Sequence, residues 1–167
     1  MTAFHLASQD VAATQRYAAA LAGAVQPGDA VVLTGTLGAG KTHFTQGFAA
    51  ALGVAGAVVS PTFNILLTYE DGRLPLFHFD LYRLDDPDEL EDTGYYDMLD
   101  GGGVTFIEWG DRFPGELPDD YVLVDISADA SGLRTLQVNG RGARGNELAE
   151  AWLAALQAQN VLEAGER

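Results

Sequence analysis

The pattern of apolar and polar positions predicts alternating strands and helices in the first part of the chain. Residues 4–6 have the character of a short edge strand, and a helical stripe over 9–24 follows, with Ser8 as its expected N-cap. Residues 30–33 are all apolar, which is typical of a strand buried on both faces of a parallel sheet. Apolar side chains then recur four residues apart within 43–52 and predict another helix.

Two hairpins are predicted further along the chain. Strands over 63–70 and 74–84 flank an Asp-Gly dipeptide, which favours a tight turn. Strands over 121–127 and 133–138 are joined by a similarly short connection. Because a tight turn can join only antiparallel neighbours, both pairs are expected to be antiparallel.

The strand over 74–84 carries a polar pair on one face. Its alternation places Phe77, Phe79 and Leu81 on a core face, and Leu76, His78, Asp80 and Tyr82 on the other. The imidazole of His78 and the carboxylate of Asp80 therefore point the same way. They are either paired polar residues on the sheet surface or groups that handle a metal ion or water.

A phosphate-binding motif lies between the strand 30–33 and the helix 43–52. Residues 35–42 read Gly-Thr-Leu-Gly-Ala-Gly-Lys-Thr, which matches the pattern G-x-x-x-x-G-K-[ST] in its strand–loop–helix context. Glycines let successive backbone N–H groups surround a polyphosphate, and the positive end of the helix faces the same anion. The residues predicted to bind a nucleotide are Gly35, Leu37, Gly38, Ala39, Gly40, Lys41, Thr42 and His43.

Two side chains of this loop carry specific roles. Lys41 can reach the β- and γ-phosphates, and the Thr42 hydroxyl can bind Mg²⁺. Lys41 is the only lysine in the 167 residues, since the other eight basic residues are arginines, and a compact ammonium suits phosphate contact. With the hairpins, the loop predicts a three-layer α/β domain of the P-loop NTPase type. Its mixed central sheet is expected to be parallel around the loop and antiparallel at the edges.

Two more residues are candidates for the same site. The apolar run 104–107 ends in Glu108, the form in which a buried strand delivers one carboxylate to a Mg²⁺ site. Thr62 follows Pro61, which stiffens the chain there, and is a candidate sensor of the γ-phosphate and Mg²⁺. The alternatives are structural: a turn-stabilising hydroxyl for Thr62, and a purely structural role for Glu108.

The composition limits the partners and the compartment. The net charge of −15 argues against a broad nucleic-acid or membrane surface, and the lack of cysteine excludes disulfides, thiolate metal sites and a cysteine nucleophile. No apolar run is long enough to span a bilayer and the N-terminus has no signal pattern, so a cytoplasmic protein is expected. Residues 1–167 fit a single domain, with 163–167 as a frayed tail.

Four segments together resemble the TsaE family, bacterial ATPases needed to make threonylcarbamoyladenosine in tRNA. They are the phosphate loop 35–42, Ser-Pro-Thr-Phe at 60–63, His-x-Asp-x-Tyr-Arg at 78–83 and Ile-Glu-Trp at 107–109. The resemblance covers roughly 8–136. Four motifs in this order are far more specific than the phosphate loop alone.

The resemblance implies a site and a set of partners. By it, the loop binds ATP or ADP, Thr42 and Glu108 hold Mg²⁺, Thr62 belongs to a switch-like loop, and Asp80 supports slow hydrolysis together with Lys41. The family works with TsaB and TsaD, which bind tRNA and transfer the threonylcarbamoyl group. Contact with tRNA is therefore expected only through that complex.

Two other classes of protein share the phosphate loop. A small-molecule kinase needs an arginine-bearing lid and an acceptor pocket, and here only Arg141 and Arg144 lie close together. A guanine-nucleotide switch reads its base with an Asn/Thr-Lys-x-Asp motif, and the only lysine already lies in the phosphate loop. Guanine recognition of that kind is excluded, which favours adenine, and the kinase stays as the alternative function.

Overall fold

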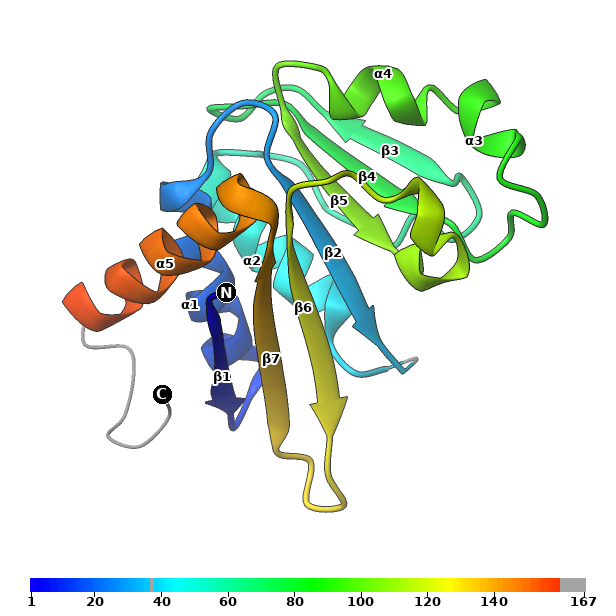
Figure 1. Ribbon diagram of the computed structural model, residues 1–167. Coiled ribbons are helices and arrows are strands. Elements are labelled where there is room, and N and C mark those ends of the chain that lie inside the picture. The colour runs from blue at the N-terminus through cyan, green and yellow to red at the C-terminus, as the bar shows by residue number, and fades with distance from the viewer. Residues whose placement is uncertain (37, 160–167) are drawn as a thin grey trace.

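The computed structural model describes residues 1–36 and 38–159 of the chain. Their strands form a seven-stranded sheet in the order β1-β7-β6-β2-β5-β4-β3 (Figure 1). The strands are β1 (Ala3–Ser8), β2 (Ala30–Gly35), β3 (Leu66–Tyr69), β4 (Leu76–Asp80), β5 (Val104–Glu108), β6 (Tyr121–Ala128) and β7 (Arg134–Arg141). The helices are α1 (Val11–Ala24), α2 (Lys41–Leu52), α3 (Glu89–Asp92), α4 (Tyr95–Leu99) and α5 (Gly142–Ala158), with short 3-10 helices η1 (Gly110–Arg112) and η2 (Pro114–Glu116). Leu37 and the tail 163–167, both named in the predictions, lie outside the described residues.

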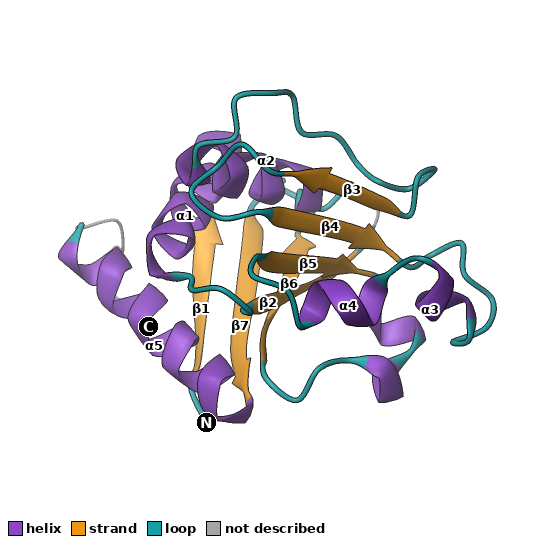
Figure 2. Ribbon diagram, turned by 90° about the horizontal axis from the view of Figure 1, so that it is seen from above, coloured by secondary structure: helices purple, strands orange, loops and turns teal. Residues whose placement is uncertain are grey.

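The sheet is parallel at its centre and antiparallel towards both edges. β2 pairs in parallel with β5 and β6, and β5 pairs in parallel with β4. Both predicted hairpins are present, β3 with β4 and β6 with β7, and β1 adds an antiparallel edge strand. Helices α1, α2 and α5 cover one face of the sheet, and α3 and α4 lie over the other (Figure 2). The predicted three-layer α/β fold with a mixed sheet is confirmed.

Two apolar clusters on opposite faces of the sheet explain the continuous apolar run in β2. Val31 and Leu33 belong to the larger cluster, with residues of α1, α2 and α5. Val32 belongs to the smaller cluster, with Leu90 of α3 and Tyr95 of α4. Since successive side chains of a strand point to opposite faces, both sides of β2 are buried. This packing fixes the carboxyl end of β2, where the phosphate loop begins.

The predicted N-cap of the first helix is wrong. Asp10 caps α1, and its carboxylate accepts a hydrogen bond from Ala13 N at 2.7 Å. Ser8 is still part of β1 and is buried, with its hydroxyl 2.6 Å from that of Thr14. The strand therefore continues further than the polar side chain of Ser8 indicated.

Strand β4 also differs from expectation in one respect. Its side chains alternate as predicted, with Leu76 in the larger cluster and Phe77 and Phe79 in the smaller one. All five of its residues are nevertheless buried, so the interpretation of His78 and Asp80 as a polar pair on the sheet surface is wrong.

Across residues 1–36 and 38–159, no helix is both long and apolar enough to cross a membrane.

Candidate phosphate-binding site

The described glycines of the loop between β2 and α2 adopt backbone conformations that favour glycine. Gly35, Gly38 and Gly40 adopt φ angles of 137°, 81° and 115°, which residues with a Cβ rarely adopt. A Cβ on Gly35 would also clash with the carbonyl of Ile126 on β6. Among the described residues, no side chain caps the N-terminus of α2. The first N–H groups of this helix are therefore available to an anion.

Lys41, the first residue of α2, lies in the hollow of this loop. Its side chain is largely buried, and Nζ donates a hydrogen bond to Gly35 O at 2.6 Å. Nζ also lies 4.9 Å from the centre of the Trp109 ring, within the range of a cation–π contact. Trp109 directly follows β5 with a φ of 60°, which is uncommon for a bulky residue. The sequence left the position of Trp109 open, and the structure places its ring beside Lys41.

A cavity of about 150 Å³ brings most of the predicted site residues together. It lies between the phosphate loop and the carboxyl ends of β4 and β5. The predicted residues that line it are Gly38, Gly40, Lys41, Thr42, His43, Thr62, Asp80 and Glu108, and Ser60 and Trp109 complete the lining. Gly35 lines a neighbouring cavity instead, and the side chain of Ala39 is buried in the core. The binding roles of these residues stay predictions.

The two acids of the site face the loop from neighbouring strands. In the parallel register of β4 and β5, Asp80 lies opposite Glu108, and both are almost fully buried. Asp80 accepts two hydrogen bonds, from Tyr82 N at 2.9 Å and from the Thr62 hydroxyl at 3.0 Å. The Thr62 hydroxyl also lies 2.7 Å from that of Ser60. These contacts attach the loop before β3 to the end of β4.

Glu108 has a different partner. Its Oε2 lies 2.6 Å from Nε2 of His78, and the imidazole is fully buried. Nδ1 of the same ring is buried and has no hydrogen-bond partner within the described structure. The sequence placed His78 beside Asp80 along one strand, but it did not reveal the contact with Glu108, since that contact depends on which strand lies next to β4.

Arg134, at the start of β7, forms hydrogen bonds with the phosphate loop. Its Nε donates to Ala39 O at 2.6 Å and its Nη2 donates to Gly38 O at 3.2 Å. Sequence reasoning assigned Arg134 no role because the two segments are 95 and 96 residues apart along the chain. These two bonds satisfy carbonyl groups of the phosphate loop and connect it to β7.

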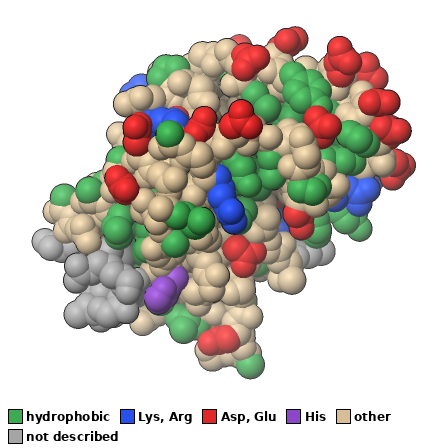
Figure 3. Space-filling view, viewed as in Figure 1, with side chains coloured by type: hydrophobic (Ala, Val, Ile, Leu, Met, Phe, Trp, Pro, Cys, Tyr) green, Lys and Arg blue, Asp and Glu red, His purple; other side chains and the backbone are tan. Residues whose placement is uncertain are grey.

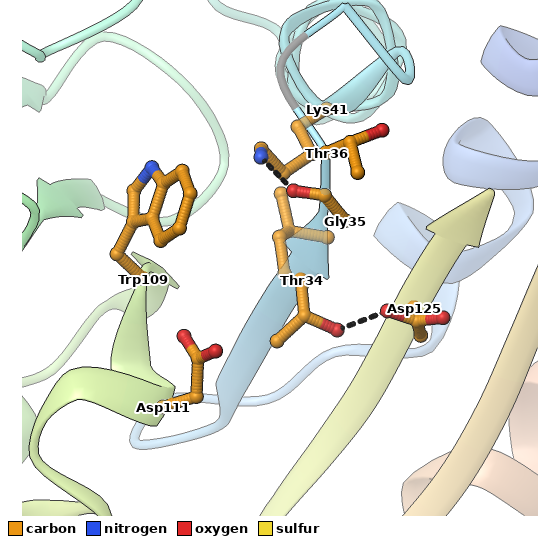
Figure 4. Close-up of a pocket in the computed structure, with 8 residues that line it drawn as sticks. Thr34, Gly35, Thr36, Lys41, Trp109, Asp111 and Asp125 are labelled. Atoms are coloured by element: carbon orange, nitrogen blue, oxygen red, sulfur yellow. Dashed lines mark hydrogen bonds between the residues drawn. The ribbon is translucent and has the colours of Figure 1, made fainter.

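A second cavity, of about 390 Å³, lies beyond Lys41 and Trp109, which line both cavities (Figure 4). At its other side the Thr34 hydroxyl donates to Oδ1 of Asp125 at 2.6 Å, and Asp111 lies nearby (Figure 4). Thr34 comes from β2, Asp125 from β6 and Asp111 from η1. No local pattern in the sequence connects them.

The oxygen donors around the smaller cavity fit Mg²⁺. Thr42 contributes a hydroxyl, and Asp80 and Glu108 contribute carboxylates. Within the described part of the chain, no group of three or more His, Cys, Asp or Glu side chains could hold a metal by itself. Mg²⁺ commonly binds through one or two carboxylates together with phosphate oxygens and water, so such a sparse donor set suits it.

The strand order, the glycine loop after β2 and the acids at the ends of β4 and β5 define a P-loop-type α/β protein. A family model described as "Threonylcarbamoyl adenosine biosynthesis protein TsaE" matches residues 8–136, and the chain belongs to this family. The expected family is therefore confirmed.

Individual relatives agree with this assignment. The tRNA threonylcarbamoyladenosine biosynthesis protein TsaE of Bacillus subtilis strain 168 is 40% identical over 137 residues, which cover 82% of this chain and 85% of the relative. The protein of the same name from Treponema pallidum strain Nichols is 40% identical over 125 residues, covering 75% and 92%. The crystal structure of Bacillus subtilis YdiB matches with a TM-score of 0.79 and 32% identity, over 92% of this chain and 95% of that one.

Proposed function

We propose that this protein binds ATP and ADP with Mg²⁺, hydrolyses ATP slowly, and serves as an accessory protein in threonylcarbamoyladenosine formation in tRNA. One observation carries the proposal: the phosphate loop, Lys41 and two buried carboxylates line one cavity. A cavity with only a structural role would not need an ammonium and two carboxylates so close together. The family and its relatives supply the biosynthetic context.

The phosphates would be held by the loop N–H groups and by Lys41. In the structure Nζ of Lys41 bonds to Gly35 O, so the ammonium is already in the hollow of the loop. Thr42 and Glu108 would hold Mg²⁺, which neutralises charge on the β- and γ-phosphates when it is bound. The helix N-terminus of α2 adds its positive end to the same anion.

Asp80 would orient or deprotonate the attacking water. A carboxylate has about four sites that can accept hydrogen bonds, and two are occupied by Tyr82 N and the Thr62 hydroxyl. Those two bonds fix the carboxylate while leaving it able to accept a water proton. Thr62 would contact the γ-phosphate, and its hydrogen bond to Asp80 would couple the loss of that phosphate to the carboxylate.

We place the protein in the cytoplasm, acting with TsaB and TsaD and contacting tRNA only through them. The net charge of −15 supports indirect contact, since direct binding to tRNA needs a basic surface. Partner proteins would then regulate the slow turnover. Size-exclusion chromatography of the purified protein mixed with TsaB and TsaD, with and without nucleotide, tests the proposed association separately.

A small-molecule kinase is the alternative, and the larger cavity beside Lys41 is the observation in its favour. A kinase would place its acceptor there. No described residue lining either cavity is an arginine, however, and an arginine-bearing lid is what such a kinase needs. Release of phosphate from ATP without any added acceptor separates the two functions.

The decisive experiment uses the single lysine. An amine-reactive ATP analogue has two amine targets in the chain, Lys41 and the α-amino group of Met1. We expect Lys41 to be labelled, to be protected by excess ATP with Mg²⁺, and Lys41→Ala to lose both labelling and hydrolysis with an unchanged melting temperature. Arg16→Ala, which removes one positive charge from an exposed position of α1, should behave as wild type. Equal labelling of Lys41 with and without saturating ATP would overturn the proposal.

A further inference from the structure

His78 is a polar residue in apolar surroundings. It is fully buried on the face of β4 that also carries Leu76, which belongs to the larger apolar cluster. Its ring packs edge-on against Phe106 of β5, with the ring centres 6.4 Å apart. Burying an imidazole with one nitrogen unpaired costs free energy, so packing alone does not explain a histidine here.

The one hydrogen bond found for this imidazole goes to Glu108. A carboxylate only accepts hydrogen bonds, so Nε2–H of His78 is the donor to Oε2, at 2.6 Å. Nδ1 then carries a lone pair, because a proton there would be a buried donor without an acceptor. The contact uses Oε2 of Glu108, and the same residue lines the cavity.

We infer that His78 is a positioning residue, which holds the Glu108 carboxylate in the orientation that Mg²⁺·nucleotide requires. The inference rests on the proposed function. A glutamate side chain has three rotatable bonds, and a buried donor at a fixed place selects one arrangement of them. Groups that orient a metal-binding side chain in this way typically change metal affinity by about 10–100-fold when removed. The other acid, Asp80, has its own supports in Tyr82 N and Thr62.

The test compares two substitutions of His78 whose side-chain amides differ in length. The side-chain nitrogen of His78→Gln can occupy the place of Nε2 and still donate to Glu108, whereas that of His78→Asn is too short and lies near the place of Nδ1. His5→Gln, on the exposed side of β1, is the matched control. Binding of a fluorescent ADP is measured in EDTA and across a Mg²⁺ titration, and melting temperatures show whether each variant is folded.

We expect His78→Asn to reduce the Mg²⁺-dependent gain in ADP affinity about tenfold or more, with little change in EDTA. His78→Gln should keep most of that gain, and His5→Gln all of it. An unchanged Mg²⁺ dependence in His78→Asn, or an equal loss with and without Mg²⁺ in a folded variant, overturns the inference. Wild-type protein that binds no nucleotide at all overturns the proposed function instead.

A spectroscopic measurement that leaves His78 in place keeps the inference testable if both His78 variants unfold. With only three histidines in the chain, the ring nitrogens of His78 can be assigned by ¹⁵N NMR. We expect the proton on Nε2, and a changed Nε2 signal in Glu108→Gln, with or without nucleotide. A proton on Nδ1, or a spectrum that does not respond to Glu108→Gln, overturns the pairing on which the inference depends.

Discussion

Asp80 and Glu108 are two buried carboxylates at the ends of neighbouring strands, and their partners distinguish them. Asp80 accepts from a hydroxyl and a backbone N–H, which are close to it in the chain or on the adjoining loop. Glu108 accepts from a buried imidazole on the next strand. The two acids line the same cavity, but different hydrogen-bond donors hold each of them. The proposed function likewise gives the two acids different roles, Asp80 towards water and Glu108 towards Mg²⁺.

At this scale we predict that Asp80→Asn lowers the rate of ATP hydrolysis by about 10²–10⁴, with ATP affinity close to that of wild type. The amide has nearly the shape of the carboxylate but cannot take a proton from water. Single-turnover hydrolysis and equilibrium binding of ATP, both with Mg²⁺, give the two quantities. A large loss of affinity at an unchanged rate would make Asp80 a ligand of the nucleotide or metal.

At the scale of elements, the turn between β6 and β7 positions Arg134 against the phosphate loop. Asp129 begins this turn, and its Oδ1 accepts from Ser131 N, the Ser131 hydroxyl and Leu133 N. The hydroxyl of Ser131 contributes most to lowering the pKa of Asp129 below its ordinary value of 3.8, and backbone N–H groups add to it. Arg134 follows directly and bonds to the carbonyls of Ala39 and Gly38.

The lowered pKa gives a pH-dependent prediction for this hairpin. A carboxyl whose pKa is lower in the folded state adds stability above pH 3.8, and that stability is lost as the pH falls through the folded value. Asp129→Asn should therefore melt slightly below wild type at pH 7, with the difference shrinking in acid below pH 3.8. Melting curves across pH, with carboxyl NMR of Asp129, measure both effects. A difference that persists unchanged in acid would contradict the assignment.

The elements also show what could be predicted from the sequence. The strand before the phosphate loop, the helix after it and both hairpins follow from local patterns, and all are present. The pairing of His78 with Glu108 and the contact of Arg134 with the loop depend on the strand order, which local patterns do not encode. Ser8 was misassigned because a hydroxyl before a helix can cap it or lie buried, and only packing decides between the two.

At the scale of the whole molecule, Arg144 ties α5 to the start of β2. Its Nε and Nη2 donate to the two carboxylate oxygens of Asp29 at 2.8 and 2.7 Å, across 115 residues of sequence. Asp29 is 5% exposed and also accepts from Gln26 N. The hydrogen bond with Asp29 is the main reason why the pKa of Arg144 is raised above its ordinary value. The pair anchors the strand that carries the phosphate loop.

We predict that Arg144→Met lowers the free energy of unfolding by about 1–3 kcal/mol, because Asp29 stays buried with fewer donors. Urea unfolding measures the change. Glu147→Gln is the matched control, since Glu147 is exposed and lies 3.5 Å from Arg144, and its effect should stay within about 0.5 kcal/mol. If Arg144→Met and Glu147→Gln unfold at the same urea concentration, the pair does not stabilise the fold.

Half of the eight arginines of this acidic protein form hydrogen bonds with other parts of the fold. Four of them donate to backbone carbonyls or to a carboxylate: Arg73, Arg112, Arg134 and Arg144. Exposed acids meanwhile gather over α3 and the segment before it, at residues 85–92 (Figure 3). The surface therefore combines a net charge of −15 with few cations placed for a phosphate backbone.

From this charge distribution we predict that the isolated protein does not bind tRNA at physiological salt. Proteins that do bind through phosphate contacts have non-specific dissociation constants of about 10⁻⁴–10⁻⁶ M, and they release counterions when they bind. Fluorescence anisotropy of labelled tRNA should show no binding by the protein alone up to about 10⁻⁴ M. The same tRNA should be bound when TsaB and TsaD are added. Binding by the isolated protein that weakens steeply with added salt would mean that a basic surface exists despite the overall charge, and that contact with tRNA is direct.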